Sequence, residues 1–193
     1  MTGELRDERV DLEVVSSERV YEGAVWDVRS DTVRYGDGQM TRQYVEHPGA
    51  VAVVALDDEG RVVLIQQYRH PIRQRDWEIP AGLLDVAGEP PLDTAKRELS
   101  EEVDLQAERW QPLVSVHTTP GGNDEIIHIF LARGLSATGG TFDREHEESD
   151  MRVERLPLAE AVDAVFAGRL RNGILATGVL AAAEVLRREA ASA

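Results

Sequence analysis

Short runs with strand character fill the first two thirds of the chain, and helical periods occur only midway and at its end. The strand-like runs are rich in β-branched residues and are bounded by glycine, proline or acidic turns. They are Val25–Tyr35, Met40–Glu46, Val51–Leu56, Val62–Tyr68, Trp77–Pro80, Trp110–His117 and Ile126–Ala132. Turn residues at 36–38 and 57–60 join the first two pairs of runs, so each pair predicts a β-hairpin.

Three segments have the spacing of helices. The middle one begins with Pro90 and Pro91, which suit an opening turn because the N–H groups there need no helical partner. Its apolar residues then recur at intervals of three and four, at Leu92, Ala95, Leu99 and Val103. The other two segments close the chain, at Leu158–Phe166 and Ile174–Arg188.

This order of elements predicts the fold class. The polar stretch Ser136–Asp150 predicts a mobile loop before the last two helices. Strands with one isolated helix midway and helices at the end predict an α+β fold or mixed sandwich. A doubly wound sheet would need helices between most strands, and the sequence lacks them.

The amino-acid composition restricts the classes of molecule that the protein is expected to bind. The chain has 36 acidic and 21 basic residues, a formal net charge of −15, which repels nucleic acid and anionic lipid. No apolar run reaches the about 18 residues of a membrane span, and there is no cysteine. We therefore expect a cytoplasmic protein with no nucleic-acid or membrane partner. If its substrate is an anion, bound metal and a few arginines must reverse the field locally.

The middle helix carries candidate metal ligands. Glu98, Glu101 and Glu102 lie at i, i+3 and i+4, so their carboxylates share one helix face. Like charges at that spacing repel unless something compensates them, and Mg²⁺ prefers such oxygen ligands. The alternative is a solvated acidic surface, which a bare run of this kind favours. The neighbouring residues favour a metal site over a solvated surface. Arg97 directly precedes the glutamates, and both Glu89 and Gly82 lie before the helix.

Together these residues resemble the Nudix box. The matching positions are Glu89, Arg97, Glu98, Leu99, Glu101, Glu102 and Leu105, with Gly82 as the opening glycine. Two features depart from the motif. Six residues separate Gly82 from Glu89, one more than in the motif, and flexible Gly88 can absorb the extension. Asp104 replaces the glycine expected at the helix end, where Asp is among the next most tolerant residues, so we expect a slightly weaker helix terminus and an intact metal site.

The resemblance implies a Nudix α/β/α sandwich with an N-terminal β-hairpin extension. The extension is expected over residues 1–48 and the Nudix hydrolase domain over residues 49–193. The resemblance implies that the backbone carbonyl of Ala81 and the three glutamates bind Mg²⁺ or Mn²⁺. It also implies that Arg97 and Glu89 orient those carboxylates. The implied chemistry is hydrolysis of a phosphoanhydride, with Glu98 and Glu102 among the catalytic residues.

Residues outside the box resemble the ADP-ribose pyrophosphatase branch of the family. Pro120 and Gly121, followed by Glu125, match a proline with a glycine and an acid at this place, although they also suit a simple turn. Arg69, in a Gln-Tyr-Arg sequence, is a candidate contact for the diphosphate. Either Glu147 or Glu148, in the predicted mobile loop, is the candidate general base.

The branch also implies a homodimer that exchanges its N-terminal strands and completes the neighbouring nucleotide site. Trp26 and Tyr44 are then candidates to stack on adenine and Arg42 to reach a phosphate or ribose, although each equally suits packing or surface roles. The expected reaction is hydrolysis of ADP-ribose to AMP and ribose 5-phosphate. The alternatives are another nucleoside diphosphate, such as a nucleotide sugar or an oxidised nucleotide, and a non-catalytic sensor that binds ADP-ribose.

Overall fold

The computed structural model describes residues 4–140 and 150–192. The chain forms two compact units. The larger unit consists of Pro48–Thr118 and Glu125–Ala193, and the smaller consists of Met1–His47 and the loop Thr119–Asp124. Within the described residues, no helix has both the length and the hydropathy of a membrane span.

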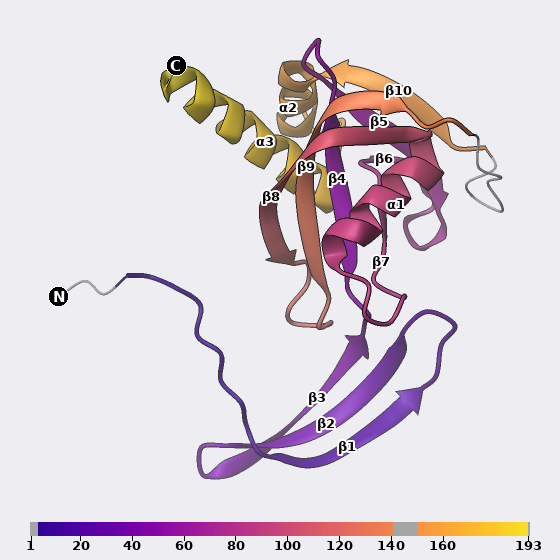
Figure 1. The fold of residues 1–193 in the computed structure, drawn as a ribbon. Coiled ribbons are helices and arrows are strands. Elements are labelled where there is room, and N and C mark those ends of the chain that lie inside the picture. The colour runs from indigo at the N-terminus through magenta and orange to yellow at the C-terminus, as the bar shows by residue number, and fades with distance from the viewer. Residues whose placement is uncertain (1–3, 141–149, 193) are drawn as a thin grey trace. The chain divides into compact units, whose positions relative to one another are not determined.

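The larger unit is built on a seven-stranded sheet (Figure 1). Its strands are β4 (Ala50–Leu56), β5 (Arg61–Arg69), β6 (Gln74–Glu78), β7 (Ala81–Leu83), β8 (Leu105–His117), β9 (Ile126–Ala137) and β10 (Arg152–Pro157). The main order is β10-β5-β4-β9-β8, while β6 pairs with β5 and β7 pairs with β4. Only β4 and β9 run parallel among the pairs of described strands, and the other pairs are antiparallel.

Helices cover both faces of this sheet, so the unit is a three-layered α/β/α sandwich (Figure 1). The helices are α1 (Pro91–Val103), α2 (Leu158–Phe166) and α3 (Gly173–Ser192), and the short 3₁₀ helix η1 (His70–Ile72) lies between β5 and β6. Every residue of β4 is buried. Val51 and Val53 pack in the cluster under α1, whereas Ala52 and Val54 pack in the cluster under α2 and α3. A strand covered on both faces has no polar face, which explains its continuous apolar run.

The structure confirms the predicted fold class, the three helices and six of the seven strand-like runs. The seventh, Trp77–Pro80, is only partly correct, because β6 begins at Gln74 and ends at Glu78. The structure adds three strands that the sequence pattern did not reveal, β1, β7 and β10. β7 has only three residues. β10 is an edge strand with charged residues at three of its six positions, and most of its residues are exposed. Charged side chains are typical of edge strands because they discourage pairing with other chains, but they hide the strand from a hydrophobicity pattern.

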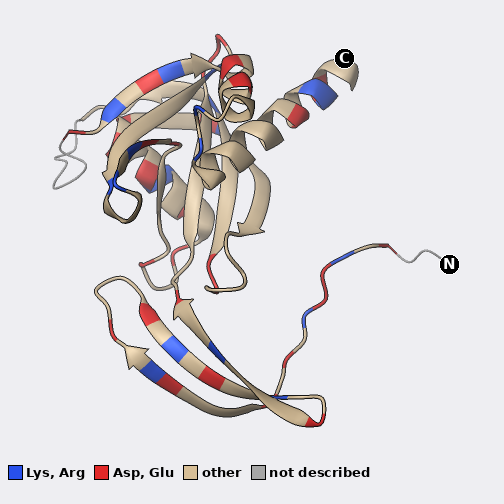
Figure 2. Ribbon diagram, turned by 180° about the vertical axis from the view of Figure 1, so that it is seen from behind, with Lys and Arg blue, Asp and Glu red and all other residues tan. Residues whose placement is uncertain are grey.

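The smaller unit is a three-stranded antiparallel sheet, β1 (Val14–Tyr21), β2 (Asp27–Tyr35) and β3 (Gly38–Glu46). The predicted hairpin is the β2–β3 pair, and β1 adds a strand beside β2. Acidic and basic positions are mixed along these strands (Figure 2). They form ion pairs such as Arg29 with Glu46, at 2.8 Å, and Arg19 with Asp27, at 2.9 Å.

The loop 119–124 belongs to the smaller unit because it bonds to β3. The backbone N–H of Val45 donates to the carbonyl of Gly122 at 2.9 Å. In return, the N–H of Asp124 donates to the carbonyl of Val45 at 3.3 Å. No described residue from 4 to 47 is buried. Among the described residues, this sheet therefore has no buried core of its own.

Candidate metal centre

The helix α1 is fixed by its apolar side. Ala95, Leu99 and Val103 are buried in the cluster that this helix shares with β4, β5 and β9. The helix begins at Pro91, as the sequence predicts. It ends at Val103 and is capped by Asp104, whose φ of 55° and ψ of 33° are left-handed. This is the conformation that favours glycine at a helix end, and aspartate is among the residues that tolerate it.

The three glutamates of the acidic face differ in exposure. Glu102 is only 5% exposed, and its Oε2 accepts the backbone N–H of Ala81 at 2.9 Å. The Glu98 side chain is 13% exposed, and that of Glu101 is 42% exposed. The face therefore runs from a buried carboxylate beside β7 to one near solvent. Glu102 thus lies beside Ala81 and Glu98 lies against Gly82, whereas Glu101 is linked to Glu98 through Arg97.

Arg97 forms hydrogen bonds with several carboxylates of this face. Its Nη1 donates to Oε1 of Glu98 at 2.7 Å and to Oε2 of Glu101 at 3.1 Å, and its Nη2 donates to Oε2 of Glu89 at 3.2 Å. The hydroxyl of Thr94, which is fully buried, donates to the same Glu89 oxygen at 2.9 Å. One guanidinium thus holds three carboxylates. Charge-assisted bonds of this type are stronger than neutral ones and fix orientation.

These contacts shift several pKa values. The hydrogen bonds from Arg97 and Thr94 lower the pKa of Glu89. The hydrogen bond to Glu89 raises the pKa of Arg97 despite burial, so the guanidinium stays protonated. Burial raises the pKa of Glu98 to about 7, against the opposing effect of Arg97. A further positive charge at this face would favour ionised Glu98.

Gly82 makes the position of Glu98 possible. A Cβ atom at residue 82 would lie 2.0 Å from Cδ of Glu98 and 2.2 Å from its Oε1. No side chain larger than hydrogen fits there unless the carboxylate moves. The glycine thus provides a cradle in β7 for the Glu98 carboxylate.

The residues of this face fit a divalent cation in their chemistry. Carboxylate and backbone carbonyl oxygens are the ligands that hard cations prefer. Among the described residues, no three acidic or histidine side chains are grouped closely enough to hold an ion as they stand. Arg97 contacts Glu98 and Glu101 through one oxygen of each in the bonds above. The cradle at Gly82 keeps the Glu98 carboxylate against the sheet beside Ala81.

Arg69 lies in an ion pair that the sequence did not reveal. Its guanidinium binds both carboxylate oxygens of Glu78, at 2.8 and 2.7 Å. Gln67 donates to the same carboxylate at 3.3 Å. A signal for Glu78 was present, because it is an acidic residue between the apolar Trp77 and Ile79 of a predicted strand. Thr94 was missed as well, since a single threonine in a helix carries no pattern.

The other candidate substrate contacts are distributed over both units. Trp26 lies beside His47, with ring centroids 5.7 Å apart, and the Tyr44 hydroxyl donates to Asp31 at 3.0 Å. Burial, followed by the bond to Asp31, raises the pKa of Tyr44. In the smaller unit lie also Arg42, whose Nη1 donates to the carbonyl of Thr41, and the loop residues Pro120 and Gly121. In the larger unit, Glu125 accepts the Thr118 hydroxyl. Glu147 and Glu148 lie outside the described residues.

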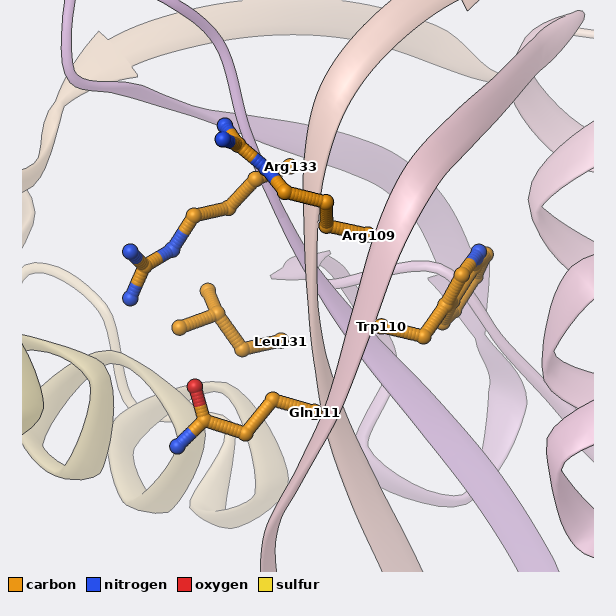
Figure 3. A pocket seen from close by; sticks show the side chains of 5 residues that line it. All are labelled: Arg109, Trp110, Gln111, Leu131 and Arg133. Carbon is orange, nitrogen blue, oxygen red and sulfur yellow. The ribbon is translucent and has the colours of Figure 1, made fainter.

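A separate hollow of about 200 Å³ lies on the face of the sheet opposite α1 (Figure 3). Arg109, Gln111 and Arg133 point into it over Leu131, while Trp110 points to the other side of the strands. Leu131 belongs to the core under α2 and α3. Arg133 forms an ion pair with Glu189 of α3, with two bonds of 2.9 Å. The hollow is therefore distinct from the acidic face of α1.

The chain is similar to several known proteins. Residues 46–174 match the model of the NUDIX domain. An ADP-ribose pyrophosphatase of Mycobacterium tuberculosis is 51% identical over 89% of this chain and 83% of its own length. A methanol dehydrogenase activator of Bacillus methanolicus is 36% identical over 91% of this chain and 95% of its own. A solved structure described as an ADP compounds hydrolase has a TM-score of 0.79 and 20% identity, and the match covers 95% of this chain and 98% of that one.

The cradle at Gly82 predicts the effect of a single methyl group. G82A should displace the Glu98 carboxylate and weaken Mn²⁺ binding about 10-fold or more, because orientation of ligands commonly contributes that much to metal affinity. Calorimetric titration with Mn²⁺ measures the change. G173A is the matched control, since a Cβ there meets nothing within 4 Å. Equal Mn²⁺ affinity in G82A and the wild type would contradict the role of the cradle.

Proposed function

The chain belongs to the NUDIX family, and on that premise we propose that it hydrolyses ADP-ribose to AMP and ribose 5-phosphate. The acidic face of α1, with Glu98 against Gly82 and Glu102 against Ala81, is the observation that carries hydrolysis. The choice of ADP-ribose is supported by the relative with 51% identity, whose name states this activity. The net charge of −15 argues against nucleic acid as a partner. The absence of cysteine supports a cytoplasmic location.

We propose Mg²⁺ or Mn²⁺ as the cofactor, held by Glu98, Glu101, Glu102 and the backbone carbonyl of Ala81. When bound, such an ion neutralises the diphosphate and lowers the pKa of a bound water. Arg97 and Glu89 hold the carboxylates in place through the network around the guanidinium. Positioning of this kind supplies much of the acceleration in phosphoryl transfer, since little covalent chemistry is left to the protein.

The remaining roles follow the resemblance to the ADP-ribose pyrophosphatase branch. Arg69 contacts the diphosphate, and it lies on the same face of the sheet as α1, beside Glu78. Glu147 or Glu148 acts as the general base. The adenosine end is recognised by residues of the smaller unit and of the β8–β9 connection. These residues are Trp26, Arg42, Tyr44, Pro120, Gly121 and Glu125.

We also propose a homodimer whose N-terminal strands, residues 1–48, are exchanged between subunits. The exposure of the smaller unit supports this. All eight residues of β1 are exposed, including Val14, Val20 and Tyr21. A small sheet needs a hydrophobic face against another element to be stable, and a second copy of the chain would provide one.

Turnover of a substrate panel tests the proposed activity. The purified chain with Mg²⁺ should release AMP and ribose 5-phosphate from ADP-ribose faster than it cleaves nucleotide sugars or oxidised nucleotides. Chromatography of the products measures this directly, and omission of the metal with a chelator should abolish the release. Equal or faster cleavage of a nucleotide sugar would assign a different substrate. Tight binding of ADP-ribose without any cleavage would instead indicate a sensor.

A charge placed on β1 tests the dimer. The wild type should sediment as a dimer, and V20E should sediment as a monomer with reduced activity, because an ionised side chain is costly in an apolar interface. V153E is the matched control, since Val153 is similarly exposed but lies on β10 of the larger unit. A wild-type monomer with full activity would exclude the exchanged-strand arrangement.

A further inference from the structure

Glu78 is a buried carboxylate that binds a candidate substrate contact. The residue ends β6 and is only 6% exposed. Its Oε1 accepts Nε–H of Arg69 at 2.8 Å, and its Oε2 accepts Nη2–H of Arg69 at 2.7 Å. The side-chain amide of Gln67 donates to Oε2 at 3.3 Å. Both oxygens therefore have defined partners, and the plane of the guanidinium is set by two parallel bonds.

These three side chains lie on the face of the sheet that α1 covers. Glu78 is directly opposite Ile65 in the β5–β6 pair, so the two side chains project to the same side. Ile65 packs in the core under α1. Gln67 and Arg69 follow Ile65 at intervals of two along β5, which places them on that side as well. The ion pair is thus on the same side of the sheet as the acidic face of α1.

Stability alone does not explain a carboxylate at this position. The neighbouring positions that face α1, such as Val53, Val63 and Ile65, are apolar and fully buried. A buried carboxylate loses its hydration, so its ion pair contributes little stability relative to an apolar residue of the same volume. Arg69 differs from Glu78 in exposure, since 44% of its side chain reaches solvent. The carboxylate is therefore buried while the guanidinium that it holds remains accessible.

We propose that Glu78 is a positioning residue that holds the guanidinium of Arg69 ready for the diphosphate of the substrate. The proposal rests on the proposed function, in which Arg69 contacts that diphosphate. Gln67 donates a further hydrogen bond to Oε2 of Glu78, which favours this orientation of the carboxylate. The chain runs from Glu78 through two residues to Ala81, whose N–H binds Glu102. Arg69 and Glu102 are thereby both bonded to the short backbone segment from Glu78 to Ala81.

A double-mutant cycle in E78Q, R69Q and E78Q/R69Q tests this role. E78Q should raise KM for ADP-ribose about 10-fold or more and change kcat much less, because the guanidinium loses its fixed orientation for binding. In the R69Q background, E78Q should change KM by less than about twofold, since the effect passes through Arg69. Affinity for ADP, measured by calorimetry, should follow the same pattern without depending on turnover.

E189Q is the matched control, because Glu189 forms an equivalent two-bond pair with Arg133 on the opposite face of the sheet. It should leave KM unchanged. An unchanged KM in E78Q, or the same rise with and without Arg69, would overturn the positioning role. Should E78Q not fold, R69K is the second variant, because it keeps the Glu78 carboxylate and replaces the guanidinium that makes two parallel bonds to it. A wild-type KM in R69K would overturn the proposal equally. Absence of wild-type turnover with ADP-ribose contradicts the proposed function instead, and the calorimetric cycle with ADP still decides the role of Glu78.

Discussion

The bonds from Arg97 to Glu89, Glu98 and Glu101 are the interaction on which the candidate site depends. Glutamates three and four residues apart repel one another on a helix, and the cost increases as burial removes water. Arg97 belongs to the same helix as two of its partners and to the same motif as the third. The helix therefore carries its own compensating charge. The three carboxylates are thereby bonded to one guanidinium before any cation binds.

The position of this helix depends in turn on the doubly covered strand β4. Alternate residues of β4 pack under α1 and under α2 and α3, so neither layer can move without opening a core. β7 pairs with β4 and brings Ala81 and Gly82 beside α1. The buried Glu102 bonds to one of these residues and Glu98 lies against the other. A rigid core thus determines the geometry of polar groups at its edge.

Most of what α1 contributes could be predicted from the sequence. The start of the helix, its acidic face and the left-handed residue Asp104 are local features, because they depend on spacing within a few residues. β10 was not predictable, since its charged residues mask an edge strand. The partner of Arg69 was also beyond prediction. The bond to Glu78 depends on how β5 and β6 pair, and the register of that pair cannot be deduced from the sequence of either strand alone.

The most direct test of the metal assignment is the anomalous scattering of Mn²⁺ in a crystal of the protein. An ion bound within coordination distance of the carboxylates of Glu98 and Glu102 and of the carbonyl of Ala81 is the predicted result. Glu101 should complete the set, with Arg97 still bonded to the remaining oxygens. An ion at another place, with these carboxylates bound only to Arg97, would contradict the account.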